Sequence, residues 1–263
     1  MNRSVQRNQL RVISYNIHQC IGRDKREDPH RTASLIQDLD AQIVGIQELG
    51  SYRAQPDSFG SLQIDTIMQV TGMMAITGPT IHHRNSSYGN CLLTRETVVS
   101  VDRLNITIDG CEPRGLLDVV LMVDGHHIRV LVTHLGLRRW ERRQQVSRII
   151  KQLQSGPMIP TLLMGDFNEW LPWSRTIHQI ERYIGKSPGL KTFPAWFPCL
   201  ALDRIWVYPR EVLIRLKAIG STESRLASDH LPLEAVIDLP ALQRSAKHSR
   251  AVNNRLDFTQ PNM

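Results

Sequence analysis

Apolar and polar residues alternate along several short stretches of the chain, and this pattern predicts strands. Residues 10–16 (LRVISYN) alternate and are rich in β-forming side chains. Residues 41–47 form a short apolar run that is typical of a buried strand and is followed directly by Glu48. Asp124-Gly125 separates two of the apolar runs and is a hairpin signal. Similar runs predict further strands at 90–94, 97–104, 115–123, 127–133, 159–165, 205–208, 212–218 and 233–237.

Helical periodicity marks four other segments. Pro29 is suited to open a helix that runs to about Leu39. Residues 58–70 and 173–184 are predicted as two further helices. Residues 138–153 form the clearest one, because their apolar positions recur on a single face. The apolar positions of that face are Val146, Ile149, Ile150 and Leu153.

The order of these elements predicts the fold class. Helices are mixed with long antiparallel stretches, which argues against a purely parallel, doubly wound sheet. Two mainly antiparallel sheets packed face to face, with helices outside, fit better: an α/β protein with a four-layer α/β/β/α sandwich. We expect one catalytic domain over residues 8–240. The periodic pattern fades after Pro240, so residues 241–263 are predicted to be a flexible basic tail.

Composition and charge narrow the partners. With 263 residues, of which 41% are hydrophobic and 22% charged, the chain has the composition of a folded protein. The formal net charge is +7, and 26 of the 32 basic residues are arginine, whose planar fork suits phosphate oxygens. The base composition of the genome explains this arginine usage equally well. The charge favours anionic substrates without choosing between nucleic acid, anionic lipid and small phosphate esters.

The cysteines and the N-terminus predict a cytoplasmic protein. The four cysteines form neither a CxxC pair nor a zinc-ligand spacing, which is typical of reduced thiols. The first ten residues contain no apolar segment of the kind found in secretory signals. No apolar stretch is long enough to cross a bilayer. We therefore expect a soluble, cytoplasmic monomer, and no obligate protein partner is inferred.

Polar residues recur at the ends of the predicted strands. Each one alone has an ordinary structural explanation: an asparagine after a strand is usually a turn residue, and a histidine there usually bonds the backbone. The ordered set, one member or pair after each apolar run, indicates a functional site on a rigid sheet edge. Its members are Asn16, Glu48, His134, Asp166, Asn168, Asp203, Asp229 and His230.

The same set carries a resemblance to a known family. Residues 10–237 resemble the endonuclease/exonuclease/phosphatase superfamily, with its deoxyribonuclease I-like fold, and most resemble its small bacterial members. The order and spacing agree over nearly the whole predicted domain. The matching elements are Ser14-Tyr15-Asn16, Gln47-Glu48, Thr133-His134-Leu135, Gly165-Asp166-Phe167-Asn168, Leu202-Asp203-Arg204-Ile205 and Ser228-Asp229-His230.

The resemblance implies a chemistry and a role for each residue. Glu48 would be the main ligand of Mg²⁺, which Mn²⁺ can replace, with Asn16 and Asp229 completing the metal site. Asp166 would orient and deprotonate the attacking water, and Asn168 would hold that water and a phosphate oxygen. His230, oriented by Asp203, would donate to a non-bridging oxygen, and His134 would be a second donor or the acid for the leaving group. Arg114 would contact the phosphate of the substrate. His18 is not part of the resemblance, but it follows closely after Asn16 and is predicted to line the substrate pocket.

Three classes of function are therefore open. The first is a divalent-metal-dependent phosphoesterase that cleaves phosphodiesters, with a DNA endonuclease as one candidate. The second is a phosphatase or phosphodiesterase that acts on a phospholipid headgroup or a small phosphorylated metabolite. Membrane-facing relatives usually carry extra hydrophobic loops, and none is evident in this sequence. The third is a non-catalytic nucleic-acid-binding protein.

Two clusters favour structural interpretations. The arginine-rich start of the helix at 138–153, with Trp140 among the arginines, can track a nucleic-acid backbone but is more typical of a solvated helix face paired with Glu141. The arginines are Arg138, Arg139, Arg142 and Arg143. An aromatic group is more typical of core or loop packing than of a substrate platform. It consists of Trp170, Trp173, Phe193, Trp196 and Phe197.

Overall fold

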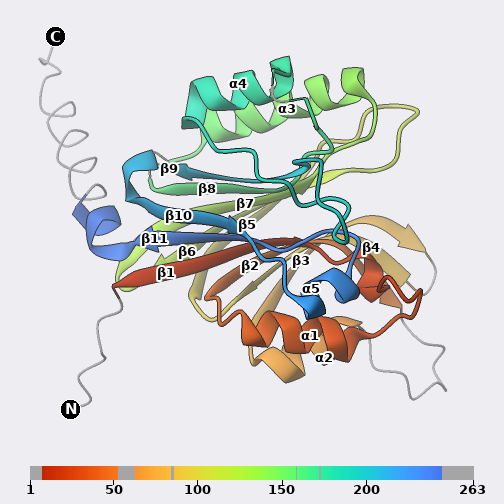
Figure 1. Ribbon diagram of the computed structural model, residues 1–263. Coiled ribbons are helices and arrows are strands. Elements are labelled where there is room, and N and C mark those ends of the chain that lie inside the picture. The colour runs from red at the N-terminus through yellow and green to blue at the C-terminus, as the bar shows by residue number, and fades with distance from the viewer. Residues whose placement is uncertain (1–7, 53–62, 84–85, 158, 172, 245–263) are drawn as a thin grey trace, which may run out of the picture.

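The computed structural model describes residues 8–52, 63–83, 86–157, 159–171 and 173–244 (Figure 1). The strands are β1 (Gln9–Asn16), β2 (Ile43–Tyr52), β3 (Met74–His83), β4 (Ser86–Thr94), β5 (Thr97–Asn105), β6 (Gly115–Val123), β7 (His126–His134), β8 (Thr161–Asp166), β9 (Asp203–Tyr208), β10 (Leu213–Ala218) and β11 (Leu233–Asp238). The helices are α1 (Pro29–Asp38), α2 (Gln63–Thr71), α3 (Arg139–Ser155), α4 (Arg175–Ile184) and α5 (Thr222–Ala227), with short 3₁₀ turns η1 (His18–Cys20) and η2 (Arg210–Val212).

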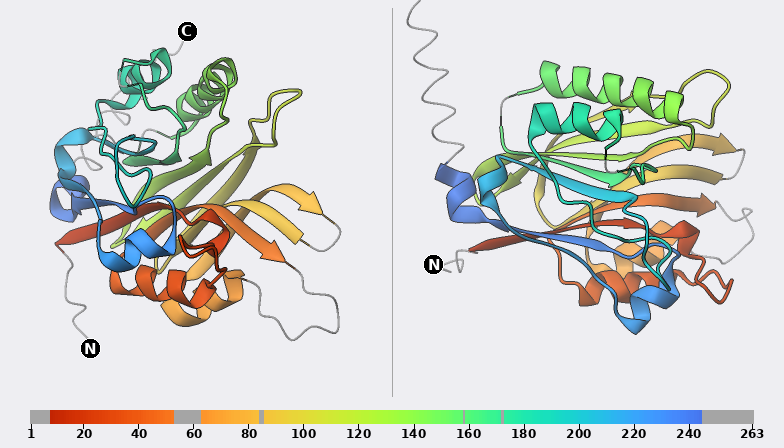
Figure 2. Two further views of the ribbon diagram at one scale, coloured as in Figure 1. Left: turned by 45° about the vertical axis from the view of Figure 1, so that its right-hand side comes forward. Right: turned by 45° about the horizontal axis from the view of Figure 1, so that its top comes forward.

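The strands form two sheets that pack face to face (Figure 2). The first sheet has the order β10-β11-β1-β2-β4-β3, and the second has the order β5-β6-β7-β8-β9. Neighbouring strands are antiparallel except for two parallel pairs, β1–β2 and β7–β8. Helices α1, α2 and α5 cover the outer face of the first sheet, and α3 and α4 cover the second (Figure 1). The predicted four-layer sandwich of mainly antiparallel sheets is confirmed.

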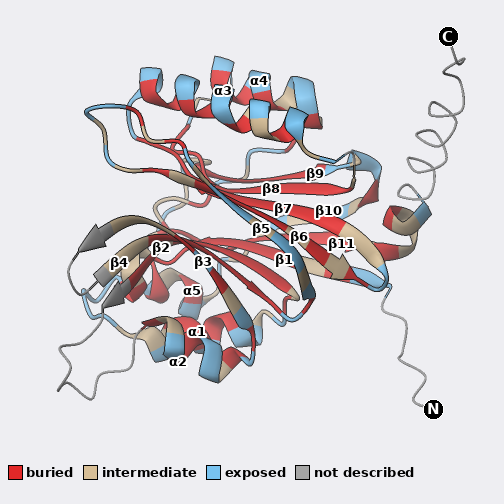
Figure 3. Ribbon diagram, turned by 180° about the vertical axis from the view of Figure 1, so that it is seen from behind, coloured by how far each residue is buried: buried red, intermediate tan, exposed pale blue. Residues whose placement is uncertain are grey.

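The alternation along the strands explains how the layers are held together. Leu10 and Val12 of β1 point into the core between the sheets, whereas Ile13 and Tyr15 pack toward the helices. Figure 3 shows that most of both sheets is buried, while the outer helix faces are exposed. Each apolar side chain that is fully buried in this way stabilises the fold by about 1.5–3 kcal/mol.

Several predicted elements differ from the structure in their bounds. Strand β2 does not stop before Glu48 but continues to Tyr52. Helix α2 begins at Gln63, and residues 58–62 of the predicted helix lie outside the described residues. Leu242 is buried in the core between the sheets, two residues past the predicted domain boundary. Residues 245–263 of the predicted tail lie outside the described residues.

One strand and one α-helix were not predicted. Strand β3 is the edge of the first sheet, and its register against β4 shifts between Pro79 and Ile81. Proline is tolerated at such an edge but interrupts the strand pattern in the sequence. Helix α5 spans only six residues, which is too short for a helical period to be recognised.

Gly165 has a backbone conformation that only glycine can adopt easily. Its φ is +150°, and a Cβ at this position would lie 1.9 Å from the carbonyl oxygen of Thr133 on the adjacent strand. The close approach of β7 and β8 at this point places Asp166 beside His134. The glycine before Asp166 is therefore required by the way the strands meet.

We expect Gly165→Ala to lower the free energy of unfolding by roughly 3 kcal/mol or more, because a backbone atom blocks the new Cβ. Gly125→Ala is the matched control, since Gly125 also has a positive φ (+81°) but has nothing within 4 Å of a Cβ. This control should lose only about 1–2 kcal/mol. Urea unfolding of both variants measures the difference, and equal losses would contradict the proposed clash.

Candidate active site

The catalytic candidates lie where the core between the sheets reaches one end of the sandwich. On β8, Leu162 and Met164 fill that core, and the next residue on the same face is Asp166. On β7, His134 likewise follows Val132. The register places His134, Asp166 and Asp203 side by side across three neighbouring strands. The alternation that builds the core therefore turns these polar side chains into the same space.

Asp166 is the centre of the cluster. Its Oδ2 accepts a hydrogen bond from Asn16 Nδ2 at 3.1 Å, and its Oδ1 accepts one from the backbone N–H of Asn168 at 2.9 Å. The Nε2 atoms of His134 and His230 both lie 3.6 Å from Oδ2. The carboxylate is almost completely buried, so these groups rather than bulk water determine its surroundings.

His230 is held as a cation by two carboxylates. Its Nδ1 lies 2.8 Å from Oδ2 of Asp203, an oxygen that also accepts a hydrogen bond from the hydroxyl of Thr192. The ring of Phe193 packs 4.8 Å from the imidazole. Burial alone would lower the pKa of His230, but Asp203 and then Asp166 outweigh it and raise that pKa to about 10.

His134 is held neutral, in contrast to His230. Burial is the largest influence on its pKa; Asp166 opposes that effect, Arg114 adds to it, and the pKa falls to about 3. Nη1 of Arg114 lies 3.2 Å from Nδ1 of His134, and the side-chain amide of Asn168 lies 3.0 Å from Nε2. Arg114 is itself buried, and its Nε has no partner within the described residues.

Glu48 reaches the site through an irregularity in β2. Residues 47 and 48 together face Asn90 of β4, because the register shifts between Ile46 and Leu49. Glu48 has a φ of +59°, which is uncommon for a residue other than glycine. Its Oε1 accepts a hydrogen bond from Asn16 Nδ2 at 2.9 Å. Backbone strain of this kind is often retained at functional sites.

Asp229 and His18 lie at the exposed edge of the cluster. Both side chains are about two-fifths exposed, and His18 Nδ1 lies 3.8 Å from Asp229 Oδ1. The hydroxyl of Ser228 donates to the carbonyl of Asn16 at 2.8 Å and accepts from the backbone N–H of His230 at 3.2 Å. Ser228 therefore ties the Asp229–His230 segment to the end of β1.

The structure thus brings the predicted residues into one connected group. Asn16, Glu48, Arg114, His134, Asp166, Asn168, Asp203 and His230 are joined by the contacts above, and His18 and Asp229 pair beside them. Residues that the sequence did not single out also take part. Thr192 and Phe193 contact the Asp203–His230 pair, and Tyr88 lines a narrow cleft with Glu48, Arg114 and His134. A lone tyrosine within a strand gives no signal of this position.

A metal ion could bind at either of two places, the Asp166–Asp203–His230 cluster or the carboxylate of Glu48. Asp166, Asp203 and His230 offer ligand atoms that all lie within 4.8 Å of one another. In that set, however, the protonated imidazole of His230 already supplies a positive charge between the carboxylates. Glu48 forms no ion pair within the described part of the chain, and its oxygen donors are of the kind that Mg²⁺ prefers. The surroundings of Glu48 therefore fit a divalent cation better than those of the Asp166–Asp203–His230 cluster do.

The arginine-rich start of α3 differs from the prediction in two of its members. Arg142 is buried, and its Nη2 lies 3.2 Å from Oε2 of the buried Glu169. Glu141 is also buried and accepts hydrogen bonds from the backbone of Arg138 and the side chain of Gln145. Glu141 is therefore a capping residue of the helix rather than a surface partner for the arginines. Arg138, Arg139 and Arg143 are exposed, as expected for a solvated face.

The aromatic group also differs from the prediction. Phe193 packs against His230, as expected for a packing residue, but four members of the group are exposed. These are Trp170, Trp173, Trp196 and Phe197. The sequence favoured core or loop packing because large aromatic side chains are usually buried, but the loops that carry these four lie outside the core and leave the rings exposed.

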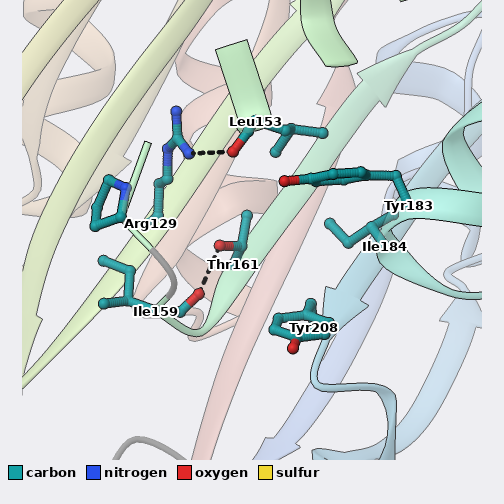
Figure 4. Close-up of a pocket in the computed structure, with 8 residues that line it drawn as sticks. Arg129, Leu153, Ile159, Thr161, Tyr183, Ile184 and Tyr208 are labelled. Carbon is teal, nitrogen blue, oxygen red and sulfur yellow. Dashed lines mark hydrogen bonds between the residues drawn. The ribbon is translucent and has the colours of Figure 1, made fainter. Parts of the chain in front are cut away.

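A separate cavity lies at the opposite end of the second sheet (Figure 4). It is lined by Thr161 at the start of β8, Tyr208 at the end of β9, and Leu153 and Tyr183 from the two helices. The guanidinium of Arg129 borders it, but the buried carboxylate of Asp118 neutralises that charge, with a 2.9 Å contact from Nε. No histidine or carboxylate lines this cavity among the described residues, so the catalytic candidates lie elsewhere.

Comparisons with known proteins match most of the chain. The model of the endonuclease/exonuclease/phosphatase family matches residues 13–230. The uncharacterised protein YbhP of Escherichia coli (strain K12) is 29% identical over 255 residues, which cover 88% of this chain and 96% of that protein. None of the described helices has the length and apolar character needed to cross a membrane.

Solved structures share the fold at lower sequence identity. The endonuclease/exonuclease/phosphatase from Beutenbergia cavernae is 22% identical and superposes with a TM-score of 0.70, covering 89% of this chain and 72% of that chain. A mannosyl-6-phosphatase from Bacteroides thetaiotaomicron is 17% identical with a TM-score of 0.67, covering 87% of this chain and 99% of that chain. These likenesses establish the sandwich architecture.

The opposite charge states of the two histidines can be measured directly. In chelator-treated protein, we expect NMR of the imidazole nitrogens to show His230 protonated up to about pH 10 and His134 neutral down to about pH 3. The raised pKa of His230 stabilises the fold fully below its ordinary value of 6.5, and this stability is lost as the pH rises through about 10. Asp203→Asn should lower the pKa of His230, because it removes the strongest charge that raises it.

His126 is the control for this titration, since it is the first residue of β7, at the opposite end of that strand from His134, and its Nδ1 lies 3.0 Å from the carbonyl oxygen of Asp124. A midpoint for His230 near 6.5 in the wild type would show that Asp203 and Asp166 do not hold it as a cation. An unchanged midpoint in Asp203→Asn would contradict the role given to Asp203.

Proposed function

We propose that this chain, which belongs to the endonuclease/exonuclease/phosphatase family, is a divalent-metal-dependent hydrolase that cleaves phosphodiester bonds by attack of water on phosphorus. The observation that carries this proposal is the position of the Asp166 carboxylate, which several other candidate residues contact. It is contacted by Asn16 from the first sheet and by His134, Asn168 and His230. These contacts fix the carboxylate at the centre of the site, where it can orient a water molecule and accept its proton.

Each residue contributes to the reaction through its position. Asp166 orients the water and accepts its proton, and Asn168 holds the water against the phosphate. His230, kept cationic by Asp203, donates to a non-bridging oxygen, where negative charge increases in the transition state. His134 is fixed by Arg114 and supplies a second donor on the other side of Asp166.

Glu48 would hold the divalent cation, with Asn16 beside it and Asp229 completing the site directly or through water. When bound, Mg²⁺ would supply positive charge that neutralises the phosphate oxygens. The strained backbone of Glu48 directs its carboxylate toward Asn16 and the catalytic cleft. Asn16 contacts both Glu48 and Asp166, so it sets the spacing between the metal ligand and the base.

Particular observations support two substrate classes. The net charge of +7 and the exposed arginines of α3 favour a polyanion such as DNA, and hence an endonuclease. The likeness to a mannosyl-6-phosphatase shows that a similar sandwich can serve a phosphatase, which favours a small phosphate ester. A non-catalytic nucleic-acid-binding role is less well supported, because every carboxylate, amide and imidazole that the reaction needs is present.

Glu48→Gln tests the metal site. We expect it to raise the Mg²⁺ concentration for half-maximal turnover at least about tenfold, because the ligand loses its charge. Turnover is measured on bis-p-nitrophenyl phosphate, supercoiled plasmid and a phospholipid panel, with and without chelator. Glu211→Gln is the matched control, since Glu211 is an exposed carboxylate in η2.

The outcomes separate the classes of function. An unchanged Mg²⁺ requirement in Glu48→Gln would show that Glu48 is not the metal ligand. DNA binding that ignores Mg²⁺, weakens steeply with salt and is accompanied by no hydrolysis would support the non-catalytic protein instead. The preferred substrate of the wild type identifies the substrate class.

A further inference from the structure

Most tryptophans of this protein are exposed, which is unusual for so large an apolar side chain. Of the five tryptophans, only Trp206 is buried. The other four, together with Leu137 and Phe197, are 45–71% exposed. We call these six residues the aromatic rim: Leu137, Trp140, Trp170, Trp173, Trp196 and Phe197.

The aromatic rim lies at the catalytic end of the second sheet. Leu137 and Trp140 follow β7, which ends at His134, and Trp170 and Trp173 follow β8, which ends at Asp166. Trp196 and Phe197 precede β9, which begins at Asp203. Because these strand ends adjoin across the sheet, all three rim segments lie at the end of the molecule where the catalytic residues lie.

Buried or partly buried arginines hold the rim segments in place. Arg142 donates to the carbonyl of Leu137 at 2.6 Å and lies 5.9 Å from the ring of Trp170. Arg225 donates to the carbonyl of Ala195 at 2.6 Å and to that of Trp196 at 3.3 Å. The exposed rings therefore stand on anchored loops, and their exposure is a property of the folded surface.

Positive charge accompanies the rim. Arg138, Arg139 and Arg143 are exposed at the start of α3, around Trp140, and form no ion pair within the described part of the chain. The guanidinium of Arg23 lies 5.9 Å from the ring of Trp196. An apolar surface with unpaired arginines is complementary to a partner that offers both an apolar layer and negative charge.

We propose that the aromatic rim docks the catalytic end of this protein onto the surface of an anionic lipid bilayer. Tryptophan is favoured at the boundary between headgroups and acyl chains, and arginine is attracted by anionic lipids. A single-stranded nucleic acid would also stack on the aromatic rings of the rim, but it offers no apolar layer for Leu137. The rim consists of single exposed side chains on short loops and on the first turn of α3, which explains why the sequence shows no hydrophobic insertion.

Docking in this orientation selects the substrate. The catalytic cleft would face the headgroup layer, so the phosphoesters within reach would be those of phospholipid headgroups. This second step rests on the proposed function, whereas docking itself requires neither the metal nor Asp166. The two parts can therefore fail separately.

The test is co-flotation of the full chain with vesicles in chelator, using Asp166→Asn so that no turnover occurs. One vesicle preparation is phosphatidylcholine alone, and the other is phosphatidylcholine with about a third phosphatidylglycerol. We expect binding to the anionic vesicles, accompanied by a blue shift of tryptophan emission, because four of the five tryptophans lie in the rim. Trp196→Ala/Phe197→Ala should weaken this binding at least about tenfold, since two exposed apolar side chains are removed.

Two controls separate the rim from general effects. Ile214→Ala removes an exposed apolar side chain from β10, outside the rim, and should bind as the parent protein does. Arg139→Glu/Arg143→Glu should weaken binding to anionic vesicles, whereas Lys151→Glu, on the same helix, should not. Thermal unfolding of every variant verifies the fold.

The proposal is overturned if folded protein floats with neither vesicle preparation, or if the rim variants bind as tightly as the parent. It is also overturned if binding to oligo-dT, rather than to vesicles, depends on the rim residues, which would assign the rim to a nucleic acid. Vesicle binding without hydrolysis of any phospholipid by the wild type with Mg²⁺ would retain the docking surface and contradict the substrate.

Discussion

The contact of Asn16 with Asp166 is the interaction on which the site depends, because it joins the two sheets at the point where their shared core ends. Leu10 and Val12 from one sheet and Leu162 and Met164 from the other fill that core. Further along the same strand faces, the apolar side chains give way to the amide of Asn16 and the carboxylate of Asp166. Burial that stabilises the sandwich therefore also removes water from the catalytic group and makes its few hydrogen bonds decisive.

The two histidines beside Asp166, His230 and His134, have the same side chain but different charge states and therefore different roles. His230 lies between two carboxylates, which hold it as a cation, whereas burial, with the added effect of Arg114, lowers the pKa of His134 and holds it neutral. His230 supplies a fixed positive charge and His134 a neutral N–H donor. Both can stabilise negative charge on the phosphate while the buried base, Asp166, stays unprotonated. This separation is a consequence of packing, because burial enlarges the effect of each neighbouring charge.

Much of the fold and most of the site could be predicted from the sequence, and the failures have physical causes. The two-residue alternation indicates which face of each strand is buried, so it placed His134 and Asp166 at strand ends correctly. It could not reveal the irregularity at Glu48, because that feature depends on how β2 pairs with β4. The burial of Arg142 depends on Glu169, which comes from a distant loop. The exposure of Trp173 could not be predicted either, because aromatic residues are usually buried and loop positions are not encoded by periodicity.

The most direct test of the account is Mg²⁺-dependent hydrolysis of bis-p-nitrophenyl phosphate by the wild type and by Asp166→Asn, measured side by side. The substitution retains the shape and buried position of the side chain but removes the base. We predict turnover that is lost in chelator and that falls about 10²–10⁴-fold in Asp166→Asn, while thermal unfolding stays close to that of the wild type. Turnover in Asp166→Asn equal to that of the wild type would contradict the central role of this carboxylate.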